Sequence, residues 1–181
     1  MCFTHLYRMS YFRLGCSLLL GLALWTGCGK STDGTPGKPT ADVFEPKQAQ
    51  PKLQTMKLYV GTQTLDAELA LTEEQEMTGM MFRTNIQDSD CMLFVLPNTQ
   101  QANFWMKNCP ESISAAYITP DGTIAEIHHL AKNDTNGVKA ATGNIRFVLE
   151  TSDGWFLRHN ISTGAVILTE HGSLADTFNA H

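Results

Sequence analysis

The chain has 181 residues, of which 43% are hydrophobic, and its 13 basic and 18 acidic side chains give a net charge of −5 at pH 7. A chain of this length holds one domain of ordinary size with its own hydrophobic core. A surface of this sign repels phosphate backbones, and the sequence lacks the basic stripe that nucleic-acid binding requires. We therefore do not expect nucleic acid as a partner.

An export signal is predicted at the start of the chain. Arg8 and Arg13 precede an apolar run from Leu14 to Trp25, and small residues follow this run. This order is typical of a signal peptide. The run is also shorter than the roughly 20 residues that a membrane-spanning helix needs. We therefore expect residues 1–27 to be a signal peptide that is removed.

Thr26, Gly27 and Cys28 resemble a bacterial lipobox, in which small residues precede a cysteine that receives a lipid and becomes the mature N-terminus. Trp25 departs from this pattern, which usually has leucine at that place. The resemblance implies an exported protein of the cell envelope, anchored to a membrane by lipid at Cys28 on the periplasmic or extracellular side. Ordinary secretion with cleavage nearby is the alternative.

Residues 28–52 are predicted to form a flexible linker behind the lipidated cysteine. The segment is rich in Gly, Pro, Ser, Thr and Lys, with Val43 and Phe44 as its sizeable apolar residues. Such a composition buries too little apolar surface to offset the entropy of the chain. As a random coil it would hold the domain on the order of 30 Å from the lipid.

Residues 53–170 are expected to form one mainly β domain, a compact sandwich or barrel of about seven short strands with one or two short helices. Apolar and polar residues alternate in residues 64–71, which is typical of a strand. Thr72 and Gln75 then form a capping box, and Gly79 ends a short helix. The sequence PDG at 120–122 marks a turn between two strands. The C-terminal tail, residues 171–181, is expected to fray.

Six short segments occur in an order and spacing that resemble the domain of unknown function 192 family. They are GMMFR (79–83), CMLFVL (91–96), FWMKN (104–108), DG (121–122), RFVLE (146–150) and GW (154–155). The resemblance spans nearly the whole domain. Members of this family are widespread prokaryotic proteins, often exported or lipid-anchored, with a compact mainly β fold and no established biochemical activity. The resemblance thus implies a fold and a location, but no mechanism.

Three residues depart from the family pattern. Cys91 stands where the family usually has glycine, and Cys109 stands where it usually has threonine. Ser114 occupies the place at which the family tends to have aspartate. A hydroxyl stays neutral near pH 7, so Ser114 cannot replace a carboxylate as a base or as a hard-metal ligand. This difference argues against an acid/base enzyme, and we predict no catalytic residue.

Cleavage at Cys28 would leave Cys91 and Cys109 as the remaining pair of cysteines. If residues 91–96 and 103–109 form a hairpin centred near Gln100, the two cysteines face each other. Opposed strand residues lie about 4.5–5.5 Å apart at Cα, which a disulfide accepts, and an oxidising compartment favours the bridge. The alternative is two independent buried thiols. A nucleophilic cysteine is least favoured, because an oxidised pair has no thiolate.

The segment NFWMKNC, residues 103–109, is the candidate ligand-binding strand. Side chains alternate along a strand, so Trp105 and Lys107 share one face, opposite the core-facing residues. An indole plate and a cation suit a carbohydrate or an anionic small ligand, and Arg83 and Asn108 could converge on the same rim. The alternative is a purely structural strand whose polar residues lie at a solvated rim.

Two further pairs of charged residues each share one face of a predicted strand. Glu126 and His128 share a strand face and could supply two metal ligands, but a site needs three or four, and His129 points the opposite way. A solvated strand end is the simpler interpretation, and we predict no metal and no cofactor. Arg146 and Glu150 also share a face, and we expect them to be exposed cross-strand charges that contribute little stability.

Three functions remain open, and one of them is a purely structural accessory protein without a ligand. The favoured one is an uncharacterised, non-catalytic lipoprotein of the cell envelope whose β domain binds a small molecule, glycan or protein partner through Arg83, Trp105, Lys107 and Asn108. The alternative is a hydrolase-like or other enzyme that acts on envelope material through the same four residues. In both cases the membrane is a further partner, through the N-terminal lipid.

Overall fold

The structure, a computed structural model, describes residues 44–178. The predictions for the signal peptide, for Cys28 and for the linker up to Val43 therefore lie outside the described residues. The three helices within residues 44–178 are all short, and none is long and apolar enough to cross a membrane.

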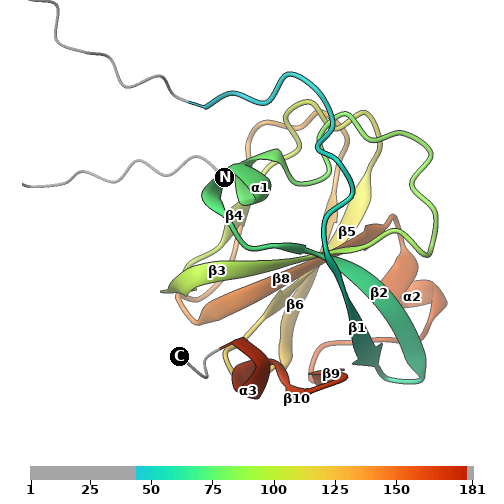
Figure 1. Cartoon of the computed structure of the whole chain (residues 1–181), viewed down its shortest axis with the longest axis vertical. Helices are drawn as coiled ribbons and strands as arrows, with labels where there is room; N and C mark the ends of the chain where they lie inside the picture. The colour runs from blue at the N-terminus through green and yellow to red at the C-terminus, as the bar shows by residue number, and fades with distance from the viewer. Residues whose placement is uncertain (1–43, 179–181) are drawn as a thin grey trace, which may run out of the picture. The chain divides into compact units, whose positions relative to one another are not determined.

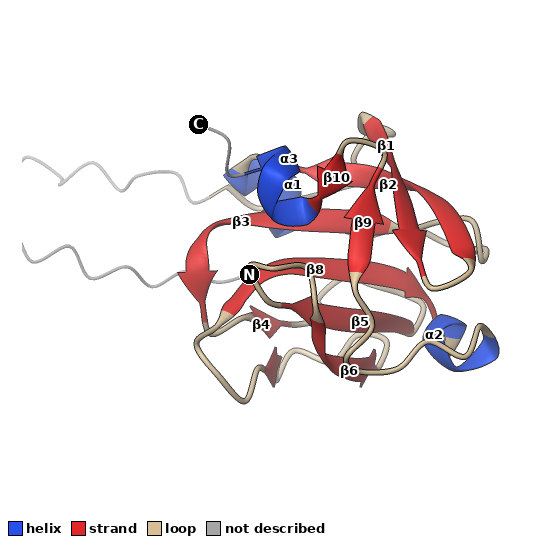
Figure 2. Cartoon of the chain, turned by 90° about the horizontal axis from the view of Figure 1, so that it is seen from below, coloured by secondary structure: helices blue, strands red, loops and turns tan. Residues whose placement is uncertain are grey.

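Eight strands form one curled sheet in the order β10-β9-β1-β2-β3-β8-β5-β6. Figure 2 shows β1 and β9 running at a steep angle to β3 and β8. The curl brings the two ends of the sheet together, where an isolated bridge joins Thr123 to Val166. The sheet is thus a half-barrel, and the predicted mainly β fold is confirmed. Its strands are β1 (Thr55–Val60), β2 (Gln63–Ala70), β3 (Met92–Gln100), β5 (Ile113–Ile118), β6 (Ile124–Leu130), β8 (Ile145–Ser152), β9 (Ile167–Thr169) and β10 (Gly172–Ser173).

The central strands bury both of their faces. Neighbouring residues of a strand point to opposite faces, and the register aligns Leu69 of β2 with Leu93 of β3 and Leu149 of β8 on the first face. The next row contains Ala70 of β2 and Phe94 of β3. It lies on the second face, in a separate apolar cluster. This two-sided burial makes the central strands nearly continuous apolar runs.

The helix α1 (Glu73–Thr78) begins and ends as the sequence predicts. The Thr72 hydroxyl accepts a hydrogen bond from the Gln75 N–H at 3.3 Å, and the Gln75 side chain accepts one from the Thr72 N–H at 3.1 Å. Gly79 ends the helix with φ of 46°, and a Cβ there would lie 3.1 Å from the Phe94 ring. Glycine at this position lets the chain turn sharply and enter the second cluster at Met80.

The expected hairpin between residues 91–96 and 103–109 is not formed. Strand β3 already has both edges occupied, by β2 in parallel and by β8 in antiparallel orientation. The short strand β4 (Asn103–Phe104) pairs instead with β7 (Val138–Lys139). Cys91 packs in the first cluster and Cys109 in the second, and both are free thiols. The disulfide prediction is therefore wrong, because the two side chains lie on different faces of the sheet.

The prediction that the chain frays from residue 171 onward is wrong for residues 171–178. These residues form β10 and the helix α3 (Leu174–Phe178). The remaining short helix, α2 (Trp155–Arg158), precedes them along the chain. The Ser173 hydroxyl accepts a hydrogen bond from the Asp176 N–H at 3.0 Å and so caps α3. Leu174 is fully buried in the first cluster. An apolar anchor that the sequence analysis missed thus holds the tail to the sheet.

The last residues of the predicted linker lie against the domain. The Gln50 side chain donates hydrogen bonds to the carbonyl oxygens of Gln75, at 3.2 Å, and of Gly79, at 2.9 Å, so it caps the C-terminal end of α1. The Leu53 N–H donates to Glu68 at 2.8 Å. Figure 1 shows this segment running past α1 into β1. We call residues 44–54 the strap.

The anchoring of the tail can be tested with a leucine pair. Leu174→Ala should lower the free energy of unfolding by about 2–5 kcal/mol, because it opens a cavity in a closed core. Leu157, in α2, is 83% exposed, so the matched change Leu157→Ala should stay within about 0.5 kcal/mol. Urea denaturation measures both, and equal losses would contradict the buried anchor.

Candidate functional site

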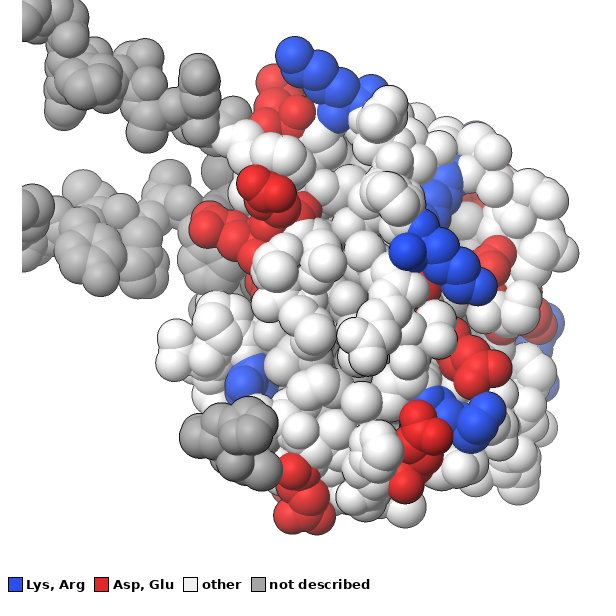
Figure 3. Space-filling view, viewed as in Figure 1, with Lys and Arg blue, Asp and Glu red and all other residues white. Residues whose placement is uncertain are grey.

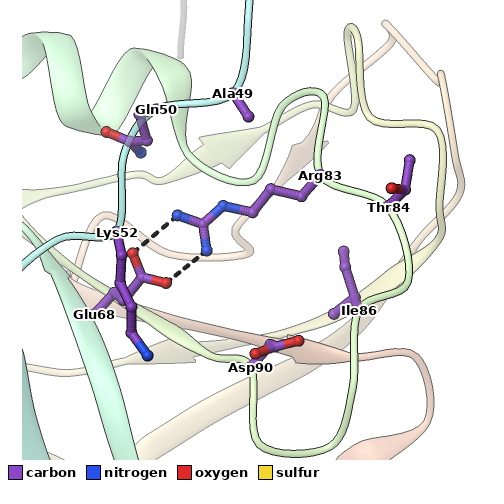
Figure 4. Close-up of a pocket in the computed structure, with 8 residues that line it drawn as sticks. All are labelled: Ala49, Gln50, Lys52, Glu68, Arg83, Thr84, Ile86 and Asp90. Carbon is purple, nitrogen blue, oxygen red and sulfur yellow. Dashed lines mark hydrogen bonds and ion pairs between the residues drawn. The ribbon is translucent and has the colours of Figure 1, made fainter.

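A cleft opens between the strap, β2 and the chain that follows α1 (Figure 4). Its volume is about 300 Å³, at the lower end of the range of small-molecule pockets. Its walls are mainly polar and carry two basic and two acidic side chains. The lining residues are Ala49, Gln50, Lys52, Glu68, Arg83, Thr84, Ile86 and Asp90.

One wall of the cleft is an ion pair between Arg83 and Glu68 with two hydrogen bonds. Arg83 Nη1 lies 2.6 Å from Glu68 Oε1, and Nη2 lies 2.9 Å from Oε2. Burial raises the pKa of Glu68, but the hydrogen bonds from Arg83 and from the Leu53 N–H outweigh it, and the net pKa lies below the ordinary value. The hydrogen bond to Glu68 raises the pKa of Arg83. Both groups are therefore charged, and each fixes the other.

The other two charged side chains of the cleft are Lys52 and Asp90. Figure 4 shows Lys52 and Asp90 at the end of the cleft away from Gln50. Neither side chain forms an ion pair with another of the described residues. The Asp90 carboxylate accepts a hydrogen bond from the Gln87 N–H at 2.8 Å, which orients it. An ammonium and a carboxylate are thus available to a ligand.

The four residues of the predicted rim do not all lie together in the structure. Arg83 lines the cleft, where its charge is engaged with Glu68. Trp105 and Lys107 lie together, with Lys107 Nζ 5.6 Å from the centre of the Trp105 ring. Lys107 also pairs with Glu45 of the strap at 2.7 Å. The segment that carries them is a turn rather than a strand, because β4 ends at Phe104.

Asn108, the fourth rim residue, contributes through its backbone. Its φ is 59°, in the left-handed region that asparagine tolerates. Its carbonyl oxygen accepts a hydrogen bond from the Phe82 N–H at 2.8 Å. Asn108 therefore joins its own turn to the chain that leads into Arg83, and it shapes the site through the backbone.

The histidines and Ser114 have local partners. His128 lies 2.8 Å from Glu126 on one face of β6, and His129 lies 2.8 Å from Asp153 on the other. The buried Ser114 hydroxyl accepts a hydrogen bond from the Gly154 N–H at 2.9 Å, so it holds the turn before α2. Within residues 44–178, no group of three or more His, Cys, Asp or Glu side chains is placed to hold a metal ion.

Glu150 is buried, with an exposed fraction of 4%, so the prediction that it is an exposed cross-strand charge is wrong. Glu150 points to the second face of β8 and makes no side-chain hydrogen bond within the described part of the chain. Burial raises its pKa to about 8, although the nearby charge of Arg83 opposes this shift. Its expected companion Arg146 is half-buried, and one of its guanidinium nitrogens has no hydrogen-bond partner among residues 44–178. The family motif RFVLE contains Glu150, but nothing in its local pattern signals burial.

A second buried carboxyl, Glu76, also escaped the sequence analysis. It lies in α1, is 8% exposed and lines the same small hollow as Glu150. Burial, followed by the charge of Glu73, raises its pKa to about 7. The second face of the sheet thus holds two carboxyls that bind protons more tightly than ordinary glutamates.

The comparisons with known proteins agree with this fold. Residues 56–169 match the family model DUF192, described as "Uncharacterized ACR". The chain belongs to this family. No curated protein matches the chain. The family description names no activity. The match therefore supports the fold, and any chemistry of the DUF192 domain has to be inferred from the arrangement of its side chains.

Two solved structures resemble this DUF192 chain. A Sinorhizobium meliloti protein described as a candidate transcription regulator is 25% identical with a TM-score of 0.63, and the match covers 66% of this chain and 97% of that one. A Novosphingobium aromaticivorans protein of unknown function is 28% identical with a TM-score of 0.60, and the match covers 64% of this chain and 85% of that one. Both support the half-barrel fold.

The buried carboxyl of Glu150 predicts a pH dependence of stability. A glutamate with the ordinary pKa of 4.5 loses its proton in the unfolded chain, whereas the folded protein keeps it up to about 8. The unfolded state therefore binds fewer protons in this window, and the free energy of unfolding falls as pH rises from about 4.5 to about 8. Glu76 adds a fall of the same sign that ends near its pKa of about 7.

Glu150→Gln should remove its share of this fall, on the order of 2–4 kcal/mol across the window. Urea denaturation at a series of pH values measures it. Glu74→Gln, on the exposed side of α1, is the matched control and should leave the slope unchanged. Coincident pH profiles of Glu150→Gln and the wild-type protein would refute a protonated Glu150.

Proposed function

We propose that this DUF192 protein is a non-catalytic binding module of the cell envelope, tethered by a lipid at Cys28. Its domain binds a small polar molecule, such as a sugar or an amino acid, in the cleft beside Arg83. The observation that carries this proposal is a cleft of about 300 Å³ with a fixed ion pair in one wall. The other candidate ligands, larger glycans and proteins, are outcomes of the binding test below.

The charge arrangement of the cleft supports a polar ligand. The bidentate pair with Glu68 neutralises Arg83 and leaves its guanidinium plane rigid. Lys52 and Asp90 then offer one charged donor and one charged acceptor to a ligand. A ligand with both an acidic and a basic group, or with several hydroxyls, can satisfy both at once. A preformed wall reduces the entropy lost when the ligand binds.

The separation of the predicted rim residues favours binding over catalysis. An acid/base or nucleophilic mechanism needs reactive groups within hydrogen-bond reach of one substrate atom. Arg83 is paired with Glu68, and Lys107 is paired with Glu45 of the strap. The buried thiols of Cys91 and Cys109 both have a pKa raised by burial to about 12, so neither supplies a thiolate.

Ligand binding in the cleft can be tested by thermal shift against sugars, amino acids, nucleotides and peptides. A ligand at 100 times its Kd should stabilise the protein by about 2.7 kcal/mol. Lys52→Ala combined with Asp90→Asn should abolish most of that shift. Lys57 and Asp66 form an exposed pair at 3.0 Å outside the cleft, so Lys57→Ala with Asp66→Asn is the matched control.

The cleft proposal fails if no class of compound stabilises the wild-type protein. It also fails if the control variant loses the shift to the same extent, because binding would then not depend on the cleft. If only peptides or long glycans stabilise the protein, the ligand of the cleft is a larger partner and not a small molecule.

The lipid anchor is tested separately at Cys28. Cys28→Ser should move the protein from the membrane fraction to the soluble or secreted fraction and should abolish labelling by a radioactive fatty acid. Cys16→Ser, within the segment predicted to be removed, is the matched control and should leave both unchanged. An unlabelled wild-type protein in the cytosol would overturn the proposed location.

A further inference from the structure

The cleft beside Arg83 contains equal numbers of positive and negative side chains. Lys52 and Arg83 are basic, and Glu68 and Asp90 are acidic. Arg83 and Glu68 bind each other through two hydrogen bonds, of 2.6 and 2.9 Å. In Figure 4, the Lys52 ammonium and the Asp90 carboxylate lie on the same side of this ion pair. One positive and one negative charge are therefore left for a ligand.

The charges of Lys52 and Asp90 act on opposite members of the ion pair. The pKa of Glu68 is raised by burial and lowered by hydrogen bonds from Arg83 and Leu53, and the positive charge of Lys52 lowers it further. The pKa of Arg83 is raised by its hydrogen bond to Glu68, against burial, and the negative charge of Asp90 raises it further. The order Asp90, Arg83, Glu68, Lys52 thus alternates in sign.

The backbone that carries the two remaining charges is held in place. The Asp90 carboxylate accepts a hydrogen bond from the Gln87 N–H at 2.8 Å, and the Asp90 N–H donates to the Gln87 carbonyl oxygen at 2.9 Å. A carboxylate has about four lone-pair sites, so Asp90 can accept further hydrogen bonds. Lys52 follows Gln50, whose side chain is bound to the end of α1. The two charges therefore stand at defined places in the wall.

The other lining residues narrow the class of ligand. Among residues 44–178 they are Ala49, Gln50, Thr84 and Ile86, none of which is aromatic. Quaternary ammonium groups are recognised by aromatic cages, so the cleft suits a primary ammonium better. Trp105, whose indole suggested a carbohydrate in the sequence, does not line the cleft. The volume of about 300 Å³ suits a small molecule.

The pair of opposite charges discriminates among small polar molecules. A carboxylate that binds Lys52 also meets the negative charge of Asp90, and an ammonium that binds Asp90 also meets the positive charge of Lys52. A ligand with a single charge is therefore attracted by one group and repelled by the other. A sugar neutralises neither group, because its hydroxyls carry no charge. A ligand with both charges is complementary to both groups.

We infer that the cleft selects a zwitterionic α-amino acid, whose carboxylate binds Lys52 and whose ammonium binds Asp90. This inference rests on the proposed function, because it takes the cleft as the binding site and names the class of its ligand. The ion pair of Arg83 and Glu68 stays intact as the wall beside the ligand. Ala49 and Ile86 are the apolar lining residues, and they are left to contact the side chain of the amino acid.

Three sets of compounds with the same side chains test this selection. They are the L-amino acids with uncharged side chains, their amides and their N-acetyl derivatives. The amides keep the ammonium and lack the carboxylate, and the N-acetyl derivatives have the reverse. Isothermal titration calorimetry with the full-length chain in detergent should show binding of at least one free amino acid. Both of its derivatives should bind about 10-fold to 100-fold more weakly, as expected for a lost hydrogen bond to a charged group.

Two single variants assign the two ends of the ligand. Lys52→Met removes the ammonium, so it should weaken the free amino acid about tenfold or more and should not weaken the amide, which has no carboxylate to lose. Asp90→Asn should weaken the free amino acid to a similar extent and should not weaken the N-acetyl derivative. A general loss of folding would weaken every compound alike. Lys57→Met and Asp66→Asn, at the exposed pair outside the cleft, are the matched controls and should keep the wild-type affinities.

The possible failures of this test are distinct. Derivatives that bind as tightly as the free amino acids would overturn the zwitterion, because one charge would then suffice. Binding of sugars in place of amino acids would also overturn it. If Lys52→Ala with Asp90→Asn abolishes that sugar binding, the cleft remains the binding site. If no compound of any class binds the wild-type protein, the proposed function fails and this inference fails with it.

Discussion

The ion pair between Arg83 and Glu68 holds together three segments of the chain, each 15 residues from the next. Glu68 belongs to β2, Arg83 to the chain after α1, and the Leu53 N–H of the strap completes the arrangement. Removing one partner of a buried ion pair leaves an uncompensated charge, which typically costs about 3–5 kcal/mol. The strap and the 79–91 chain therefore stay in place, and the cleft between them keeps its shape.

The pairing of β3 determines which segments of the chain cover the second face of the sheet. Because β3 uses both edges for pairing, the chain after it must leave the sheet and return over the second face as β4 and the 105–109 turn. This cover, together with α1, encloses side chains that would otherwise meet solvent. On the face seen in Figure 3, acidic and basic side chains are interspersed rather than gathered. The proposed function therefore rests on the cleft beside Arg83 and not on a patch of one charge sign on this face.

The sequence predicted the features that depend on neighbouring residues. The capping box at Thr72, the helix end at Gly79 and the turn at 120–122 were all correct, because each follows from local hydrogen bonds or a positive φ. The hairpin between 91–96 and 103–109 was wrong, because the pairing of β3 is set by β2 and β8, which no local pattern reveals. Glu150 was expected to be exposed, since a charge in a strand usually marks the solvent face. In a strand buried on both faces, that inference fails.

Glu68 and Glu150 are both buried carboxyl groups, but their surroundings shift their pKa values in opposite directions. They flank Met92 in a single row across the sheet, about 10 Å apart because neighbouring strands are about 4.8 Å apart. Glu68 remains ionised because Arg83 and a backbone N–H bind it, whereas Glu150 makes no side-chain hydrogen bond to another of residues 44–178 and burial raises its pKa. A single arginine cannot neutralise two buried carboxylates, so the second must hold a proton or another cation. The contacts that keep Glu68 charged in the wall of the cleft thus leave Glu150 as a buried carboxyl that keeps its proton near pH 7.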